Sequence, residues 1–259
     1  MGAILGHVWI IKVLFMQTIN ILGSKLNIIS KQELIEKAEL VLAQNEKSYH
    51  FFSLNPIKVI KAQSDQTLDK YINNADIVYP DAIGLSIASR ILYGLKLERV
   101  TGYDFHFDVL KICQKMKFSV YFLGSTDYSL KKAVAKYEQD FPGLIINGTH
   151  NGYFSDKCFF QTILPEIIQL QPKLIIVAMG AKLQEKWIEE IRSRTIVPMM
   201  MGVGGSLDTY VGNYPLGPKW VIKYGLLWLY RLIKQPSRYK VMSALPKFAL
   251  QVLIKKINI

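Results

Sequence analysis

The sequence contains no aspartate or glutamate after Asp208, although residues 215–259 carry nine basic side chains. They are Lys219, Lys223, Arg231, Lys234, Arg238, Lys240, Lys247, Lys255 and Lys256. The net charge is +12, and outside this block the basic and acidic residues nearly balance. So one-sided a block indicates an anionic partner: a membrane surface, a diphosphate or nucleic acid.

Uncharged runs long enough to span a bilayer are also missing, because lysines or arginines interrupt the longest apolar stretches. The first sixteen residues are apolar but lack the basic start of a signal peptide, and Lys12 interrupts them. We therefore interpret residues 1–17 as an N-terminal extension that can associate with a membrane. The two cysteines, Cys113 and Cys158, have no metal-ligand spacing and indicate a reducing compartment.

Several catalytic motifs are absent. The sequence has no Walker A loop, no Gly-x-Ser-x-Gly elbow, no His-Glu-x-x-His pair and no complete Gly-x-Gly-x-x-Gly turn. It also lacks the Asp-x-Asp pair with which many sugar transferases hold a metal against a nucleotide diphosphate. A leaving diphosphate would then need another cation, and arginine suits that role.

Strand-like apolar runs alternate with helical patterns along most of the chain. The runs lie near residues 50–52, 77–79, 120–123, 144–148, 173–179 and 196–201. Glycine-rich turns follow several of them, and Gly124 and Gly204 could present backbone amides to phosphate. The pattern predicts an α/β domain over residues 18–213, with a Rossmann-like, mainly parallel sheet and helices on both faces.

Asp81 stands where a short strand, Ile77–Tyr79, gives way to a helix that begins near residue 83. Pro80 cannot continue the sheet ladder, so the strand should end there. Asp81 is thus predicted at the carboxyl edge of the sheet, where open α/β folds bind ligands. The alternative is that Asp81 only caps the helix, and this stretch alone does not decide between the two.

Ser53 and Asn55 are predicted in a similar loop, after the strand at residues 50–52. They can line the same edge as Asp81, or they can serve turn formation before Pro56.

The stretch from Asp104 to Asp108 looks superficially like a metal cluster. Side chains two residues apart do not share a helix face, so we interpret Asp104 as a cap and His106 as a surface or core residue.

Residues 214–259 form a predicted basic, helical appendage. Residues 221–233 are apolar nearly all round, and Pro236 should end that helix. Beyond it, Val241, Leu245, Phe248 and Val252 share one face, opposite basic residues, although Pro246 should interrupt the helix. Such a face can pack on the domain core or enter an anionic bilayer interface. The absence of acids favours the membrane.

Seven motifs together resemble the WecG/TagA/CpsF glycosyltransferase family, in order and from about residue 18 to the C-terminus. They are Ala75-Asp76-(x)4-Asp81, Glu98-Arg99-Val100-x-Gly102-x-Asp104, Phe122-Leu123-Gly124, Gly180-Ala181-x-x-Gln184-Glu185-Lys186-Trp187, Gly202-Val203-Gly204, Pro218-Lys219-Trp220 and Leu229-Tyr230-Arg231-Leu232.

The resemblance implies an inverting, metal-independent glycosyltransferase without cofactors. It would move a sugar, such as N-acetylmannosamine or a related hexose, from a UDP-sugar to an undecaprenyl-diphosphate-linked saccharide. It would do so at the cytoplasmic membrane face, in cell-surface polysaccharide or teichoic acid synthesis. The resemblance also gives Asp81 as general base. It gives Arg99, Ser53, Asn55 and Gln184 as further active-site residues, with Gly180 in a matching turn, and Arg231 and Arg238 as diphosphate contacts.

This chain departs from the family pattern at several positions: Ala82 for Gly, Ser125 for the second Gly of a turn, Lys182 for Pro, and Val241-Met242 where arginines are common. Two alternatives remain at this stage. One is a soluble nucleotide-sugar epimerase or dehydrogenase, disfavoured by the missing dinucleotide fingerprint. The other is a nucleic-acid-binding module, disfavoured by the apolar content of the appendage. We expect no nucleic acid partner, and the oligomeric state stays open.

Overall fold

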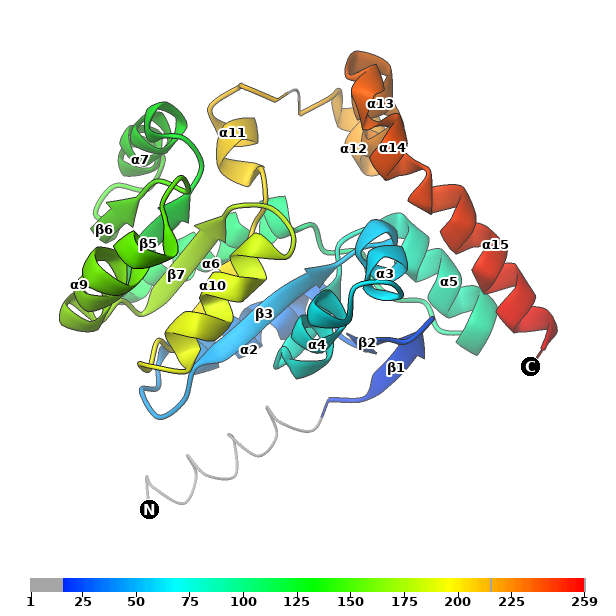
Figure 1. The fold of residues 1–259 in the computed structure, drawn as a ribbon, viewed down its shortest axis with the longest axis horizontal. Helices are drawn as coiled ribbons and strands as arrows, with labels where there is room; N and C mark the ends of the chain where they lie inside the picture. The colour runs from blue at the N-terminus through cyan, green and yellow to red at the C-terminus, as the bar shows by residue number, and fades with distance from the viewer. Residues whose placement is uncertain (1–15, 215, 259) are drawn as a thin grey trace.

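A six-stranded parallel sheet forms the centre of the computed structural model, which describes residues 16–214 and 216–258 (Figure 1). Its order is β4-β3-β8-β7-β5-β6, and every neighbouring pair is parallel. The strands are β3 (Tyr49–Leu54), β4 (Ile77–Pro80), β5 (Ser119–Gly124), β6 (Ile145–His150), β7 (Leu174–Ala178) and β8 (Met199–Gly202). A hairpin of β1 (Thr18–Ile21) and β2 (Ser24–Asn27) precedes them. The predicted parallel sheet is confirmed, whereas most of the predicted N-terminal extension lies outside the described residues.

Both faces of the sheet are buried. Along β5, Val120 and Phe122 join one apolar cluster, while Tyr121 and Leu123 join another. This alternation follows from the two-residue period of a strand. Helices cover both faces, as the sequence predicts. They are α2 (Lys31–Leu42), α3 (Pro56–Ala62), α4 (Gln66–Asn74), α5 (Ile83–Tyr93), α6 (Gly102–Met116), α7 (Asp127–Asp140), α8 (Asp156–Cys158), the π-helix η1 (Phe159–Ile163), α9 (Leu164–Leu170), α10 (Leu183–Arg192) and α11 (Ser206–Tyr210).

The residues after α11 form a chain of short helices, which we call the tail (residues 216–258). It contains α12 (Lys219–Lys223), α13 (Leu227–Lys234), the 3-10 helix η2 (Pro236–Arg238), α14 (Tyr239–Met242) and α15 (Ala244–Ile257). The predicted apolar helix across residues 221–233 is broken at Gly225, whose φ is +70°. The predicted interruption at Pro246 is wrong, because Pro246 lies in the first turn of α15, where no helical N–H is needed.

The tail packs along one edge of the body, against α3 and α5 (Figure 1). Phe248 and Val252 of α15 are buried in the same cluster as residues of α3, α4 and α5. The interpretation that the tail's apolar face packs on the domain is therefore confirmed for these two residues. The other side of α15 leaves four large apolar side chains exposed: Leu250, Leu253, Ile254 and Ile257. Among the described residues, no helix is long and apolar enough to cross a bilayer.

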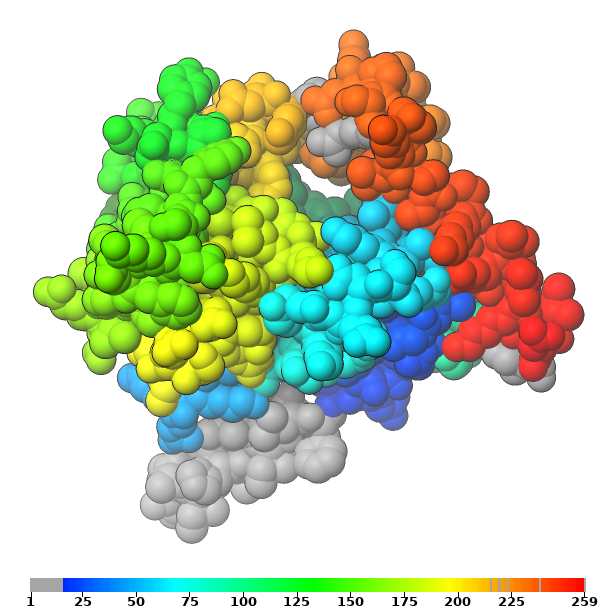
Figure 2. All heavy atoms as spheres, viewed as in Figure 1, coloured from blue at the N-terminus to red at the C-terminus, as the bar shows by residue number. Residues whose placement is uncertain are grey.

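At the other end of the tail, Gly225 lies against α5. A Cβ atom at this position would lie only 2.8 Å from Cγ2 of Ile83, so the backbone of the tail touches the helix directly. Val221, one turn earlier, is buried. The space-filling view shows a hollow between the tail and the body, above α3 and beside α11 (Figure 2). The carboxyl ends of β3 and β4 lead into this region.

Candidate active site

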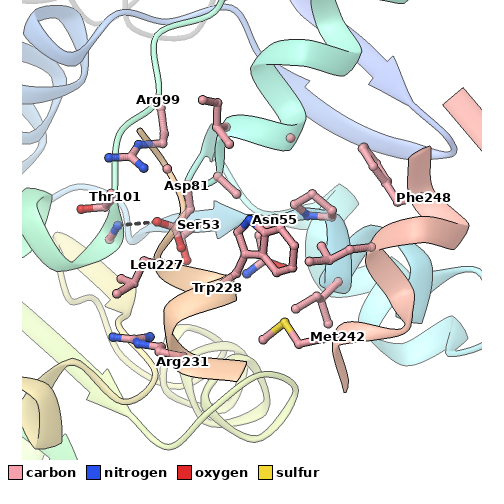
Figure 3. A pocket seen from close by; sticks show the side chains of 18 of the residues that line it. Ser53, Asn55, Asp81, Arg99, Thr101, Leu227, Trp228, Arg231, Met242 and Phe248 are labelled. Carbon is pink, nitrogen blue, oxygen red and sulfur yellow. Dashed lines mark hydrogen bonds between the residues drawn. The ribbon is translucent and has the colours of Figure 1, made fainter. Parts of the chain in front are cut away.

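A cavity of about 760 Å³ lies where β3 and β4 end, between the body and the tail. The strand ends contribute Ser53, Asn55 and Asp81 to its wall, and the loop before α6 contributes Arg99. Trp228 and Arg231 of α13 line it from the tail (Figure 3). Five of the predicted site residues thus meet in one cavity. The parallel topology brings Ser53, Asn55 and Asp81 together at one edge, and the loop before α6 and the tail add Arg99 and Arg231.

Asp81 is held by the N-terminus of α6 and not by α5, the helix that follows it in sequence. Its Oδ1 accepts a hydrogen bond from the backbone N–H of Gly102, at 3.0 Å, and Gly102 is the first residue of α6 (Figure 3). The N-cap of α5 is Ala82, without any side-chain cap. The interpretation of Asp81 as a helix cap is therefore wrong, and its carboxylate lies at the positive end of the α6 dipole.

The pKa of Asp81 lies above its ordinary value of 3.8. Burial disfavours the charged form and is the largest cause. The hydrogen bond from Gly102 and the positive charges of Lys58, Arg99 and Arg231 act in the opposite direction but do not cancel it. A carboxylate with a raised pKa is a stronger base than an exposed aspartate, which suits removal of a proton from a substrate.

Ser53 and Asn55 follow each other at the end of β3 but have different local roles. Ser53 still belongs to the strand and lies opposite Tyr79 of β4, so the prediction that it lies in a loop is wrong. Asn55 is the N-cap of α3, and its Oδ1 accepts from the N–H of Lys58 at 3.0 Å. Turn chemistry is thus confirmed for Asn55. Both residues also line the cavity.

Arg99 and Arg231 connect the body with the tail at the rim of the cavity. Nη2 of Arg99 donates to the carbonyl oxygen of Ile222 in α12, at 3.0 Å. Nη2 of Arg231 in α13 lies 3.5 Å from Oγ1 of Thr209 in α11. Each guanidinium thus joins two parts of the chain that are far apart in sequence. Arg238 lies in η2, and its side chain is outside what the structure describes.

Gln184, Gly124, Gly180 and Gly204 do not line this cavity, although neighbours of Gly204 in its turn, Val203, Gly205 and Ser206, do. Gln184 is buried at the start of α10, where its Oε1 accepts from the N–H of Gly204 at 2.9 Å. The carbonyl oxygen of Gly180 accepts from the N–H of Gln184, at 3.1 Å. At Gly124, a Cβ would collide with the carbonyl oxygen of Ala178. These contacts hold the turns in shape, and a substrate contact for any of the four residues stays a prediction.

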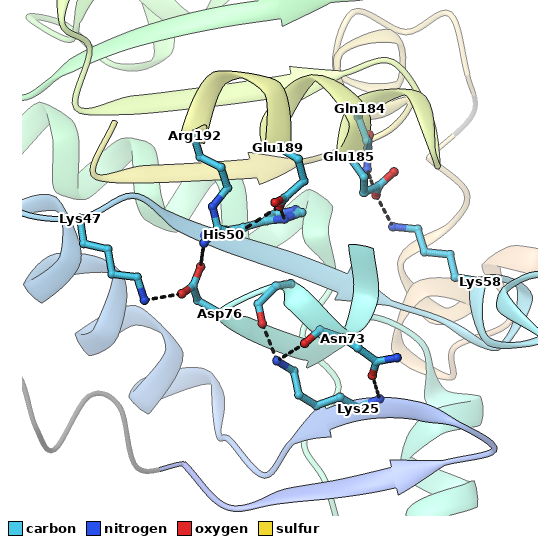
Figure 4. Close-up of polar contacts among 11 residues, drawn as sticks. Lys25, Lys47, His50, Lys58, Asn73, Asp76, Gln184, Glu185, Glu189 and Arg192 are labelled. Atoms are coloured by element: carbon cyan, nitrogen blue, oxygen red, sulfur yellow. Dashed lines mark hydrogen bonds and ion pairs between the residues drawn. The ribbon is translucent and has the colours of Figure 1, made fainter. Parts of the chain in front are cut away.

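Next to Gln184, Glu185 forms a buried ion pair with Lys58 (Figure 4). Nε2 of Gln184 donates to the same carboxylate, at 2.9 Å. Burial raises the pKa of Glu185, but the charge of Lys58 and the hydrogen bond from Gln184 outweigh it, and the pKa lies below its ordinary value. Farther along α10, Glu189 pairs with His50, and Arg192 pairs with both Glu189 and Asp76 (Figure 4). These contacts therefore link α10 to α3 at its start, and to β3 and the residue before β4 near its end.

The stretch from Asp104 to Asp108 is structural. The N-cap of α6 is Thr101, whose Oγ1 accepts a hydrogen bond from the N–H of Asp104. The prediction that Asp104 is the cap is therefore wrong. His106 is buried and lies 2.9 Å from the hydroxyl of Tyr137, while Asp108 pairs with Lys31. Within residues 16–214 and 216–258, no three His, Cys, Asp or Glu side chains group as metal ligands would.

The sequence interpretation missed three residues of the site. Tyr79, in β4, places its buried hydroxyl beside Ser53, and burial raises its pKa well above 10, so it is protonated at neutral pH. Gly102 holds Asp81 through its amide, and Lys58 adds a buried positive charge nearby. Tyr79 lies in β4, two residues before Asp81, and this short separation in sequence was the available signal. Nothing in the sequence pattern pairs Gly102 or Lys58 with Asp81.

Comparisons with known proteins agree on one family. The model of the glycosyl transferase WecG/TagA/CpsF family matches residues 19–259. The chain is similar to the N-acetylglucosaminyldiphosphoundecaprenol N-acetyl-beta-D-mannosaminyltransferase of Bacillus subtilis (strain 168), with 31% identity over 206 residues, 80% of this chain and 79% of that protein. The protein of the same name from Bacillus spizizenii (strain ATCC 23059 / NRRL B-14472 / W23) is 27% identical over 219 residues, 85% of this chain and 84% of the relative.

Proposed function

This chain belongs to the glycosyl transferase WecG/TagA/CpsF family and is a glycosyltransferase, and we propose that it moves N-acetylmannosamine or a related hexose from a UDP-sugar to an undecaprenyl-diphosphate-linked saccharide. The names of its two Bacillus relatives support the acceptor and the sugar. Family membership speaks against both alternatives, the nucleotide-sugar epimerase or dehydrogenase and the nucleic-acid-binding module.

The observation that carries the proposal is the position of Asp81, which faces the cavity with a raised pKa and is oriented by Gly102. Asp81 takes the proton of an acceptor hydroxyl as that oxygen attacks the anomeric carbon of the donor sugar. The bond from this carbon to the diphosphate oxygen breaks on the opposite side, and UDP leaves with the electron pair. One base and no enzyme nucleophile suffice for this single displacement, which inverts the configuration of the anomeric carbon.

The departing UDP gains negative charge, which the arginines at the cavity can stabilise. Arg99 and Arg231 line it, and their guanidinium groups match the geometry of phosphate oxygens. Arg238 is proposed as a further diphosphate contact on the strength of the family resemblance. With these cations and no Asp-x-Asp pair in the sequence, we propose that transfer proceeds without a metal ion.

The tail fits a peripheral position on the cytoplasmic face of the membrane, where a polyprenyl-linked acceptor lies. It carries nine basic residues and no acids, and α15 exposes four large apolar side chains. Each cation close to an anionic surface contributes about 1 kcal/mol to binding. We propose that residues 18–213 form the catalytic domain, and that residues 214–259 bind the membrane and complete the active site there.

The test is incubation with a panel of UDP-sugars and a lipid-diphosphate-linked N-acetylglucosamine acceptor, with release of UDP as the readout. We expect release only when an N-acetylmannosamine-type donor and the acceptor are both present, and the same rate in excess EDTA. Release with no acceptor dependence would contradict the transfer reaction. Loss of turnover in EDTA that Mg²⁺ or Mn²⁺ restores would contradict only the metal-free mechanism.

A further inference from the structure

The cavity at Asp81 has a second, apolar end that the transfer chemistry leaves unexplained. Among the described residues that line it, the charged ones are Asp81, Arg99 and Arg231. Figure 3 places these three on one side, and Met242 and Phe248 of the tail on the other. The cavity therefore continues from a charged end to an end walled by aliphatic and aromatic side chains.

Two helices form the apolar end, which we call the α5–α15 groove. Helix α5 contributes Ile87 and Ile91, and helix α15 contributes Leu245 and Leu253. Although they line the cavity, Ile87 is 52% exposed and Leu253 is 53% exposed, so the groove has room beside both. Large apolar side chains that face open space commonly mark a binding site for an apolar partner.

The groove continues onto the outer surface of the tail. From Leu253 onward, Leu253, Ile254 and Ile257 lie on one side of α15 and are all exposed. Leu253 belongs to both the cavity and this row. An apolar path thus leads from the cavity along α15, and lysines at 247, 255 and 256 lie on the same helix. This is the arrangement expected of a helix that meets a membrane surface.

Polar substrates do not suit the groove. A nucleotide base or a sugar ring carries several hydrogen-bonding groups, and burying them against aliphatic walls without partners is unfavourable. An acceptor that joins a saccharide to a long hydrocarbon through a diphosphate matches the cavity from end to end. Its hydroxyl groups and negative charges suit the charged end, and its hydrocarbon suits the apolar end. The charged end then holds the saccharide and the diphosphate, and the hydrocarbon extends through the groove.

We propose that the α5–α15 groove binds the first isoprene units of the acceptor lipid, next to the diphosphate. This inference rests on the proposed function, because it assigns a place to one part of the proposed acceptor. The groove also aligns the lipid with the exposed apolar row of α15, so the remaining hydrocarbon continues into the bilayer without crossing a polar surface.

The test is direct binding to the full chain by calorimetry, with farnesyl diphosphate and inorganic diphosphate as probes. Wild-type protein should bind farnesyl diphosphate more tightly, because only this probe has a hydrocarbon for the groove. Ile87→Asn and Leu253→Asn should each reduce this preference by about tenfold, the scale on which a hydrophobic pocket discriminates small changes. Leu250→Asn is the matched control: it changes an exposed leucine of α15 outside the cavity, 58% exposed, and should keep the preference.

Two outcomes would overturn the inference. One is equal affinity of the wild-type protein for the two probes. The other is a loss in Leu250→Asn as large as that in Leu253→Asn, which would mean that the whole tail surface, not the groove, attracts the hydrocarbon. Neither outcome depends on turnover. A protein that prefers farnesyl diphosphate but transfers no sugar would instead contradict the proposed function.

Discussion

The ammonium group of Lys58 lies 3.3 Å from a carboxylate oxygen of Glu185, and both side chains are buried. Lys58 also donates to the carbonyl oxygen of Ser53, at 2.9 Å, so the pair ties the end of β3 to the start of α10. Through Gln184, the same carboxylate is linked to the turn at Gly204. One buried ion pair therefore supports both the wall of the cavity and a glycine turn beside it.

We expect Lys58→Met to lower the free energy of unfolding by about 3–5 kcal/mol, because it leaves the charge of Glu185 buried without its partner. The double variant Lys58→Met/Glu185→Gln should recover part of this loss. Lys61→Met, at an exposed position of the same helix, should change it by less than about 0.5 kcal/mol. Urea unfolding measures the stability of all three variants. If the double variant recovers no stability, the proposed energetic coupling between Lys58 and Glu185 is contradicted.

Lys58 should also affect the rate of transfer, because its charge lowers the pKa of Asp81. In Lys58→Met, the acidic limb of the kcat/KM profile should move to higher pH. A merely structural lysine would lower the amount of folded enzyme without moving that limb. The profile, measured on the folded fraction, separates the two roles.

Asp81→Asn should reduce turnover by roughly 10²–10⁴-fold, the range typical of a lost general base. The fold should persist, since the asparagine oxygen can still accept from Gly102 and no helix cap is lost. Rates of UDP release and a far-ultraviolet circular dichroism spectrum check both expectations. Near-normal turnover would mean that a group other than Asp81 acts as the general base.

The raised pKa of Asp81 gives two further expectations with opposite signs. The base works only when ionised, so kcat/KM should fall as pH falls through a value above 3.8. Stability responds differently: a raised pKa favours folding at low pH, and that contribution is lost as pH rises through the folded-state value. At neutral pH, Asp81→Asn should therefore be more stable than wild type, with little difference at strongly acidic pH. Equal melting temperatures at both pH values would contradict the raised pKa.

Arg231→Ala should reduce turnover by roughly 10²–10³-fold if its guanidinium stabilises the leaving diphosphate, as losing one such donor does elsewhere. Lys234→Ala is its control: the residue is on the same helix, is exposed and does not line the cavity. Each variant removes one cation, so affinity for anionic vesicles should fall by about fivefold in both. Turnover should fall only in Arg231→Ala, measured with a short water-soluble acceptor. Equal turnover in the two variants would contradict a catalytic role for Arg231 and would mean that the tail serves only to bind the membrane.

His106 should make the protein sensitive to acid. Burial lowers its pKa from 6.5 to about 4. Between these values the unfolded chain binds a proton that the folded protein does not, so stability should fall with pH by up to about 1.4 kcal/mol per unit. His106→Gln keeps a partner for the hydroxyl of Tyr137 and should remove this slope between about pH 4 and 6.5. An unchanged slope of unfolding free energy against pH would contradict the assignment.

The sequence predicted that Ser53 and Asp81 lie close together, because parallel strands bring their carboxyl ends to one edge of the sheet. This proximity follows from the backbone topology and does not depend on side-chain contacts. It did not predict that Asp81 bonds to Gly102 instead of its own helix, since this depends on where α6 begins in space. Gln184 shows the same limit. A polar residue after a strand can face the cavity or face inward, and Gln184 faces inward because Gly204 and Glu185 satisfy its amide there.

The tail exposes a different limit of sequence reasoning. Its amphipathic spacing indicates one apolar face, but periodicity does not say what covers that face. Phe248 and Val252 are covered by the body, and Leu253 and Ile257 are exposed. Removing the whole tail would uncover the apolar cluster of α3 and α5, which is why single substitutions are the better probes of its role.

The contact between Gly225 and Ile83 sets how low the tail lies over the cavity. With hydrogen as the side chain of Gly225, the tail closes until its backbone touches α5. The contact therefore fixes the spacing between the tail and α5 at this side of the cavity. A methyl group at this position would meet Ile83 and would also strain the backbone, because φ of Gly225 is +70°, so the tail would have to move away from α5. The width of the cavity between the tail and α5 thus depends on a residue that has no side chain.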